Sequence, residues 1–293
     1  MAKRNTTLQL LACLDSEEMA ASRRRELDIP RTKAAELGAS AVLATDKGCY
    51  LDRLGRQVDW SAAVSRVCAA KRSLPPDAPL SCPQDAGSAT TRVQVSNETT
   101  LQAGRRLVER GQRPVALNFA NGVHPGGGFL NGARAQEEVL CRSSALWRAL
   151  VGDPMYEHHR SRPLPDSTDW VIYSPDVPVF RLDDGTPLDR PWLLSFMTCA
   201  APYAPAIGQP EAGDLLQRRI HRVLEVARAF RHDALVLGAW GCGAFENDPI
   251  RTAQDCRRAL EGPFSGCFSD VVFAVTDWSP GRRFLGPFRD AFS

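Results

Sequence analysis

The sequence has no long uninterrupted run of apolar residues, although 43% of its 293 residues are hydrophobic. No stretch approaches the roughly 18 apolar residues that a membrane-spanning helix needs. The opening residues, MAKRNTT, also lack the apolar run and the cleavage site of a secretory signal. These two absences exclude helical membrane proteins and favour a soluble, cytoplasmic protein with no membrane partner.

Closely spaced cysteines are missing as well. The nine cysteines are scattered, and no two of them form a C-x-x-C pair. Disulfide frameworks and zinc sites both depend on repeated close spacing. Histidine, aspartate and glutamate form no cluster with metal-ligand spacing either. We therefore expect reduced thiols, no bound metal and no cofactor.

The sequence also lacks a large net charge of either sign. The net charge is only +2, with 36 basic and 34 acidic residues, which does not indicate a nucleic-acid-binding protein. Arginine pairs such as Arg105-Arg106 fit solvated helix faces, although an anionic substrate or partner stays open. The motif G-x-x-x-x-G-K-[ST] is absent, and no G-x-G-x-x-G opens a first βαβ unit. Nucleoside triphosphatases and nicotinamide-dependent oxidoreductases are therefore disfavoured.

The first third of the chain reads as mostly helical. Leu8 to Leu14 and Arg31 to Leu37 suggest two helices, with a short extended piece near Ala41 to Tyr50. Residues 73–91 contain four prolines and read as a connection.

After this connection, apolar strand patterns alternate with amphipathic helix patterns. The expected strands cover residues 91–96, 114–120, 170–174, 192–199, 234–239 and 270–276, and the expected helices cover 99–110, 137–150, 217–230 and 251–260. This alternation predicts an α/β fold with a largely parallel or mixed sheet.

Two glycine-rich loops follow apolar strands. The first runs over residues 118–128 and contains Gly126, Gly127 and Gly128, and the second runs over residues 238–249. Ligands of open α/β sheets bind beyond the carboxyl ends of strands, and backbone N–H groups of glycine loops hold anions. One such loop could be only a tight turn, whereas two together could clamp a diphosphate from both sides.

Gln136, Glu137 and Glu138 stand where the helix after the first loop begins. Consecutive helical side chains project roughly 100° apart, so the two glutamates cannot flank one bond as paired glycosidase carboxylates do. One carboxyl could reach a scissile bond while the other holds a hydroxyl. The plainer interpretation is that acids at a helix start favour the helix dipole, which stabilises the anion, whereas a general acid must be protonated.

Cys242 lies between two glycines of the second loop and could be a nucleophile. No histidine is placed by the sequence to activate it, so a packed small residue is favoured. Phe245 in the same loop could stack on a sugar or base, or fill the core.

Taken together, these segments resemble the bacterial-type poly(ADP-ribose) glycohydrolases, which carry a triple glycine, a short spacer and Gln-Glu-Glu on a macrodomain-like fold. Residues 118–121, 173–180 and 241–245 look similar to that family as well. The resemblance is close over residues 91–277 and looser before them. It implies a three-layer α/β/α macrodomain-like fold with a mixed central sheet. It also implies two parts, a mostly helical extension at 1–90 packed on a catalytic domain at 91–293.

The resemblance further implies an enzyme, a glycoside hydrolase that cuts the ribose–ribose O-glycosidic bonds of poly(ADP-ribose), mainly in exo mode, and releases ADP-ribose. Glu138 would be the general acid and base, Glu137 would hold ribose hydroxyls, and Gln136 would be a positioning amide. Asn121 would contact the distal ribose, and Glu98 the adenine. The residues that would wrap the diphosphate are Gly126, Gly127, Gly128, Trp240, Gly241, Cys242, Gly243, Ala244 and Phe245.

Two other functions stay open at this point. A reader module would bind ADP-ribose without cutting it, but it has no use for Glu137 and Glu138. A hydrolase restricted to mono-ADP-ribosylated proteins is harder to separate by sequence. The expected partners are poly(ADP-ribose) and ADP-ribosylated proteins, with no direct nucleic-acid binding, and we expect a monomer.

Overall fold

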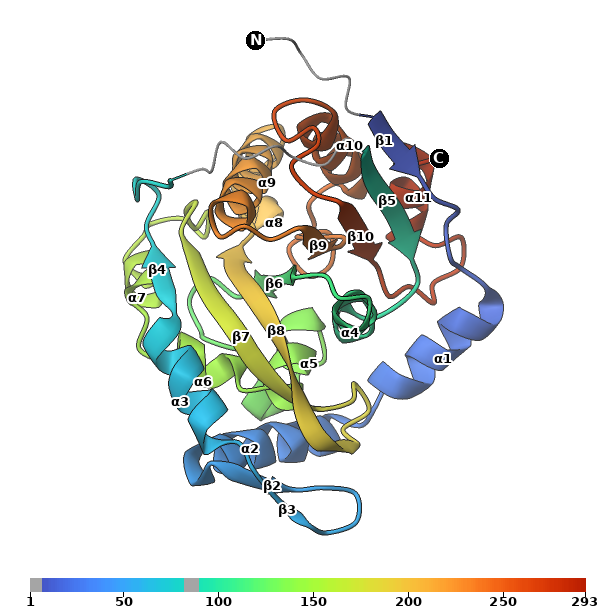
Figure 1. Ribbon diagram of the computed structural model, residues 1–293. Coiled ribbons are helices and arrows are strands. Elements are labelled where there is room, and N and C mark those ends of the chain that lie inside the picture. Colours follow the sequence, from blue (N-terminus) through green and yellow to red (C-terminus); the bar gives the residue numbers. More distant parts are fainter. Residues whose placement is uncertain (1–6, 82–89) are drawn as a thin grey trace.

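The centre of the molecule is an eight-stranded mixed sheet (Figure 1), seen in a computed structural model that describes residues 7–81 and 90–293. The spatial order is β1-β5-β10-β9-β6-β8-β7-β4, and only β7 runs against the other strands of this sheet. A separate hairpin joins β2 and β3. The strands are β1 Thr7–Leu10, β2 Cys49–Leu51, β3 Gln57–Asp59, β4 Arg72–Leu74, β5 Thr90–Ser96, β6 Pro114–Ala120, β7 Val171–Arg181, β8 Pro187–Ala200, β9 Ala234–Leu237 and β10 Asp270–Ala274.

Helices cover both faces of the sheet. Helices α2 to α6 pack on one face, and α9, α10 and α11 pack on the other. Figure 1 shows α9 and α10 on the opposite side of the strands from α2 and α3. The helices are α1 Glu17–Leu27, α2 Arg31–Lys47, α3 Ser61–Ala70, α4 Thr100–Glu109, α5 Gln136–Ser143, α6 Leu146–Leu150, α7 Pro154–Arg160, α8 Ala204–Ile207, α9 Glu211–Ala229, α10 Pro249–Glu261 and α11 Leu285–Ala291, with a 3₁₀ turn at Phe129–Asn131.

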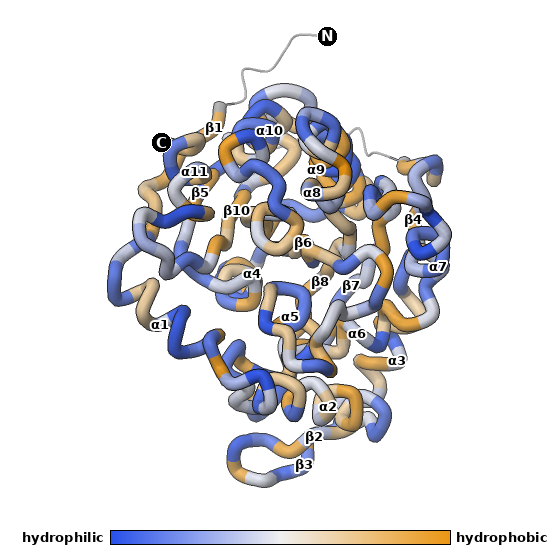
Figure 2. Tube along the Cα trace, turned by 180° about the vertical axis from the view of Figure 1, so that it is seen from behind, coloured by the Kyte–Doolittle hydropathy of each residue, from blue (hydrophilic) through white to orange (hydrophobic). Residues whose placement is uncertain are grey.

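The side chains of the central strands alternate between two hydrophobic cores. Val115 and Leu117 of β6 point into the core beneath α9 and α10, while Ala116 between them points into the core beneath α4 and α5. Successive strand side chains face opposite sides, so a strand covered on both faces must be apolar throughout. Figure 2 shows this as orange strands in the middle of the molecule, with most of the blue in outer helices and loops. The predicted three-layer α/β/α fold with a mixed sheet is confirmed.

The N-terminal region differs from the prediction in two places. Leu8 to Leu14 is not a helix, because Leu8 and Leu10 lie in β1, which pairs in parallel with β5. Both leucines pack against the same core, as alternate residues of a strand do. The predicted extended piece near Ala41 to Tyr50 is also mostly wrong, since α2 continues to Lys47 and ends at Gly48, whose φ of +68° is left-handed.

The helix predicted at residues 137–150 is two helices. Helix α5 ends before Ser144, whose extended backbone bridges to Val179 of β7. The Ser144 hydroxyl donates to the Leu140 carbonyl oxygen at 2.7 Å and accepts from the Leu146 N–H at 3.2 Å. This side chain therefore ends one helix and starts α6. The predicted strand at 114–120 matches β6 at both ends.

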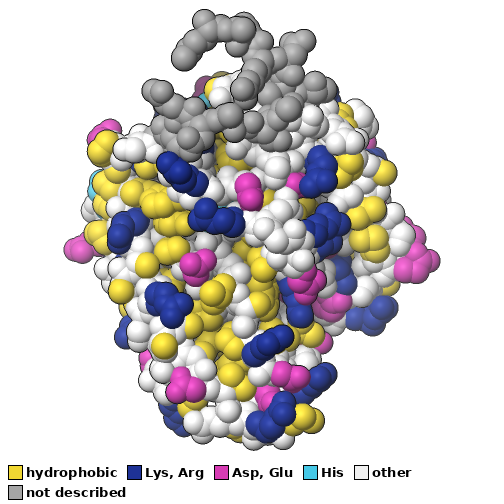
Figure 3. Space-filling view, viewed as in Figure 1, with side chains coloured by type: hydrophobic (Ala, Val, Ile, Leu, Met, Phe, Trp, Pro, Cys, Tyr) yellow, Lys and Arg dark blue, Asp and Glu magenta, His cyan; other side chains and the backbone are white. Residues whose placement is uncertain are grey.

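The predicted connection at 73–91 is described only in part, because residues 82–89 lie outside the described residues. Among residues 7–81 and 90–293, no helix is long and apolar enough to cross a membrane. On the face shown in Figure 3, lysine and arginine side chains are scattered among acidic and apolar ones. That distribution agrees with the small net charge.

Candidate active site

The two glycine-rich loops meet at one edge of the sheet. Strands β6 and β9 are parallel neighbours, so both loops leave from the same edge. The helices that follow them, α5 and α10, lie on opposite faces of the sheet, and the loops diverge to leave a crevice. A cavity of about 300 Å³ fills this crevice. Its lining includes Asn121, Gln136, Glu137, Glu138, Trp240, Gly241, Gly243, Ala244 and Phe245.

The triple glycine packs directly against the two glutamates. Gly126 and Gly127 have left-handed φ angles of +76° and +56°. A Cβ atom added to Gly127 would lie 2.4 Å from Glu138 Oε1 and 3.0 Å from Glu137 Oε2. The loop therefore needs glycine both for its backbone conformation and for its contact with the carboxyl groups.

Glu138 has one anchored oxygen and one free oxygen. The Gly128 N–H donates to Oε1 at 3.0 Å. Oε2 is buried and has no hydrogen-bond partner in the part of the chain that the structure describes. Glu138 lines the cavity, and the Gly128 N–H sets the orientation of its carboxyl group while the second oxygen makes no hydrogen bond to the described residues.

Glu137 is held by donors from β6 and the loop after it. Its Oε2 accepts from the Asn121 N–H at 2.7 Å, and its Oε1 accepts from the Asn118 side-chain amide at 3.2 Å. Burial raises the pKa of Glu137 to about 8; the Asn121 N–H lowers it and the nearby Glu138 raises it further. Glu137 is therefore mostly neutral at pH 7, and the glutamate pair then carries at most one negative charge.

We expect Glu137→Gln to become more stable than the wild type as pH rises. A carboxyl whose folded pKa lies near 8 and whose unfolded pKa lies near 4.5 contributes stability that is complete below pH 4.5. The wild type loses that contribution as pH rises to 8. Glutamine has no ionisable group, so the variant does not lose stability in this way. The difference in free energy of unfolding, measured in urea, should grow by the order of a few kcal/mol between pH 5 and 8.5.

Glu157→Gln is the control for this measurement, because Glu157 is exposed on α7. Its free energy of unfolding should follow the wild type at every pH. Parallel pH curves for the wild type and Glu137→Gln would show that Glu137 ionises normally in the folded protein.

Gln136 fastens the start of α5 to strand β6. Its side-chain oxygen accepts from the Phe119 N–H at 2.9 Å, and its amide nitrogen donates to the Leu117 carbonyl oxygen at 2.7 Å and to Thr100 Oγ1 at 3.1 Å. The side chain also lines the cavity. In this geometry Gln136 fixes the position from which Glu137 and Glu138 project.

The second glycine loop is tied together by Asn247, a residue to which the sequence alone assigns no role. Its amide nitrogen donates to the carbonyl oxygens of Pro202, Gly241 and Phe245 at 2.9, 3.2 and 3.3 Å. Phe245 is half-buried at the cavity and packs edge-to-face on Tyr203. The loop is thus a rigid wall opposite α5.

Cys242 turns its side chain away from the cavity. The thiol is buried, and burial raises its pKa to about 12. A thiol in this state is a poor nucleophile at neutral pH. The interpretation of Cys242 as a packed small residue therefore agrees with the structure, and its Sγ lies 3.5 Å from the Trp240 carbonyl oxygen.

Glu98 lines a second cavity, of about 410 Å³, which continues the first. The two cavities share Phe119, Ala135, Gln136, Ala239 and Gly243. Glu98 is buried and forms an ion pair with Arg106 at 2.5 Å. The opposite wall is the loop after β10, residues 275–279 with Phe284, which is not among the predicted site residues. Its position after a strand that ends at the same edge is the signal that could have found it.

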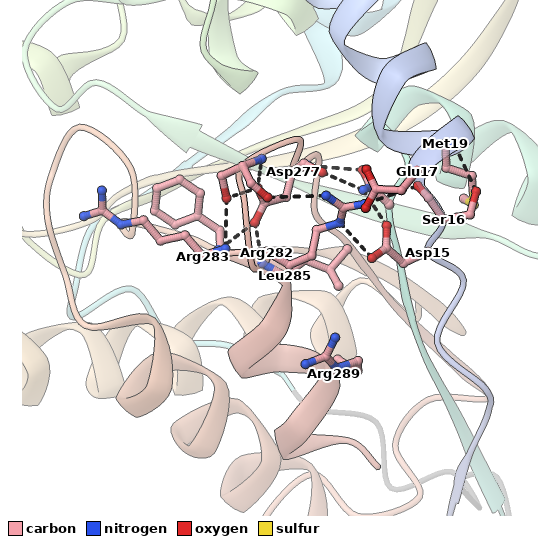
Figure 4. A network of polar contacts seen from close by, with 12 residues as sticks. Asp15, Ser16, Glu17, Met19, Asp277, Arg282, Arg283, Leu285 and Arg289 are labelled. Atoms are coloured by element: carbon pink, nitrogen blue, oxygen red, sulfur yellow. Dashed lines mark hydrogen bonds and ion pairs between the residues drawn. The ribbon is translucent and has the colours of Figure 1, made fainter.

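A polar network fastens this wall to the N-terminal segment (Figure 4). The Asp277 carboxylate accepts from the N–H groups of Phe284 at 2.7 Å and Leu285 at 3.0 Å. Arg282 reaches across to Asp15 at 2.8 Å and Glu17 at 2.9 Å. The segment between β1 and α1 therefore holds the loop that lines the second cavity.

We expect Arg282→Met to lower the free energy of unfolding by about 2 kcal/mol, because Asp15 would lose a charged hydrogen-bond partner. Urea unfolding measures this effect. Arg105→Met is the matched control, because Arg105 pairs with Glu109 in an exposed ion pair that contributes little. Equal effects of both substitutions would contradict the role of the network.

Among residues 7–81 and 90–293, no group of three or more histidine, cysteine, aspartate or glutamate side chains could hold a metal ion.

Comparison with known proteins identifies a family to which this chain is similar. Residues 39–182 match the family described as microbial-type PARG, catalytic domain. Among solved structures, poly(ADP-ribose) glycohydrolase from Thermomonospora curvata is 40% identical with a TM-score of 0.83, and the match covers 89% of this chain and 99% of that one. The same organism's enzyme bound to the inhibitor ADP-HPD is 39% identical with a TM-score of 0.81, covering 88% and 99%.

The enzyme from Deinococcus radiodurans in complex with ADP-ribose is also similar, at 39% identity and a TM-score of 0.70, covering 78% of this chain and 96% of that one. No curated protein sequence matches significantly. The structural matches span nearly the full length of these relatives.

Proposed function

Because the chain belongs to the microbial-type poly(ADP-ribose) glycohydrolases, we propose that it cuts the ribose–ribose bond with Glu138 as general acid and then general base. The family and the glycohydrolase activity are those predicted from the sequence. The roles of individual residues are our proposal, and the geometry of Glu138 is the observation that carries it.

Glu138 meets two requirements of a residue that transfers a proton. Its Oε1 is fixed by the Gly128 N–H, and its Oε2 faces no protein donor in the described part of the chain. A proton on Oε2 can therefore be aimed at a substrate oxygen without breaking a bond within the protein. Positioning of this kind is what makes a side-chain acid effective.

The proposed reaction has two steps. Glu138 gives its proton to the ribose 2′ oxygen that leaves, the bond from that oxygen to the anomeric carbon breaks, and its electron pair goes to the oxygen. The resulting carboxylate then takes a proton from water, whose oxygen bonds to the positively charged anomeric carbon. Glu138 ends protonated, as it began, and the net change is the addition of one water.

Glu137 would hold the distal ribose from beside Glu138. It lines the cavity, and its raised pKa keeps it mostly neutral at pH 7, so it does not add a second negative charge. One carboxyl group would then suffice for proton transfer, with the substrate's own phosphates stabilising the oxocarbenium ion.

The continuous cleft supports a placement for an ADP-ribose unit. The diphosphate would lie along the second glycine loop, from Trp240 to Phe245, whose walls line the first cavity. The adenosine would enter the second cavity, where Glu98 would read the base. Asn121 would contact the distal ribose. Gly127 and Gly128 would serve chiefly to hold Glu138, since they pack on its carboxyl group.

We further propose that the enzyme acts mainly on the free end of the polymer, as a monomer, on poly(ADP-ribose) attached to modified proteins. A time course with automodified polymer, resolved by size, tests this. Exo cleavage should release ADP-ribose from the first minutes while the polymer shortens gradually, whereas early accumulation of oligomers would indicate endo cleavage. Polymer that is bound but never shortened would overturn the function and indicate a reader.

A further inference from the structure

Arg142 is a buried cation that the proposed reaction does not yet use. Its side chain is 1% exposed, and it is among the largest fully buried side chains of the protein. None of its three guanidinium nitrogens has a hydrogen-bond partner among residues 7–81 and 90–293. An unpaired buried charge is costly, so its presence needs a physical explanation.

The position of Arg142 relates it to Glu138. Both residues lie on α5, four positions apart, and side chains at this spacing share one face of a helix about 5–6 Å apart at Cβ. Arg142 is therefore one helical turn after Glu138, and it does not line either cavity of the cleft. It can therefore act on the site through its charge.

Asp183, in the turn after β7, supplies the second nearby charge. Its Oδ2 accepts from Thr99 Oγ1 at 2.8 Å, while its Oδ1 is buried and has no partner in the described residues. Burial raises the pKa of Asp183 to about 6; the Thr99 hydroxyl lowers it, Glu26 raises it, and Arg23 and then Arg142 lower it. Burial lowers the pKa of Arg142, and Asp183 and then Glu138 raise it.

The other titratable groups around this pair belong to several elements. They are Glu137 and Cys141 on α5, Arg134 in the loop before it, Arg181 at the end of β7, and Arg23 and Glu26 on α1. Arg181 donates to the Arg142 backbone carbonyl oxygen at 3.2 Å. Arg142 is the cation that follows Glu138 by one turn of the same helix.

We propose that Arg142 is a positioning residue whose buried charge allows Glu138 to exchange its proton during the reaction, with Asp183 as the counter-charge. The proposal rests on the proposed role of Glu138. The second reaction step needs the carboxylate, and a nearby cation favours that charged form.

The test compares Arg142→Met with Arg142→Lys over a range of pH, with release of ADP-ribose from polymer as the assay. Without the cation, the carboxyl group should hold its proton more tightly. The alkaline fall of kcat should then move to higher pH by about one unit, and kcat at pH 7 should fall about tenfold. Arg142→Lys keeps the charge and should keep the wild-type profile. Affinity for ADP-ribose, measured by calorimetry, should change less than about twofold, since Arg142 does not reach the cavity.

Asp183→Asn gives a second test, in which the pH profile of kcat should shift in the opposite direction. This variant tests the proposal if Arg142→Met does not fold. Asparagine keeps an acceptor for Thr99 but removes a negative charge, so the profile should move to lower pH. An active wild type whose profile is unchanged by both substitutions would overturn this proposal alone. A wild-type chain that releases no ADP-ribose would overturn it together with the proposed function.

Discussion

Glu138→Gln is expected to lower kcat for polymer hydrolysis by about 10³-fold and to leave ADP-ribose binding within about twofold of the wild type. Glutamine keeps an oxygen that can accept from the Gly128 N–H, so the side chain should stay in place. Its other atom is an amide nitrogen, whose protons are far too weakly acidic to be transferred to the leaving oxygen. The substitution thus removes the chemistry and retains the geometry.

Single-turnover release of ADP-ribose and calorimetric titration with ADP-ribose measure these two quantities. Glu157→Gln, an exposed change of the same kind on α7, should be indistinguishable from the wild type in both. Full degradation of polymer by Glu138→Gln at the wild-type rate would rule out the mechanism. Loss of ADP-ribose binding together with activity would instead assign Glu138 to binding.

Gly127→Ala is expected to reduce activity by about 10²-fold or more while the protein still folds. The added Cβ would meet Glu138 Oε1 at 2.4 Å, so the carboxyl group must move and lose its bond to the Gly128 N–H. The left-handed φ of +56° adds about 1 kcal/mol of backbone strain. Rates of ADP-ribose release and circular dichroism would measure activity and folding.

Gly152→Ala isolates the part of this effect that comes from the backbone. Gly152 has a φ of +75°, and a Cβ added there meets nothing within 4 Å. It should cost about 1 kcal/mol of stability and leave activity unchanged. Equal losses of activity in the two variants would show that the contact between Gly127 and the carboxyl group is unimportant.

The predictable parts of the fold are those in which many consecutive residues follow one hydrophobic pattern. Strand β6 is seven residues of mostly apolar, buried sequence, and both of its ends were predicted. Strand β1 is four residues long, and its leucines fit either a strand or a helix. Only its pairing with β5 makes this segment a strand and not a helix. The break between α5 and α6 likewise depends on the bridge from Ser144 to Val179, 35 positions away in sequence order.

The residues of the site also fall into two groups, those that the sequence makes predictable and those that it does not. Its glycines and acids were visible because unusual residues stand together in sequence. Asn118 could have been found, because an amide in an apolar strand must be paired when buried. Asn247 and Arg142 could not, since each acts through contacts or charges from distant segments. The sheet order that makes β6 and β9 neighbours is a property of the whole chain.

The two outermost strands of the main sheet, β1 and β4, both come from the first 81 residues and are four and three residues long. They pair with residues 90–93 of β5 and residues 171–173 of β7, and so cover part of the outer edge of each strand. Open strand edges are templates for pairing with other molecules, and short outer strands blunt them. A chain that begins at residue 91 would keep every glutamate of the cleft. It would, however, expose the unpaired edges of β5 and β7 and tend to aggregate.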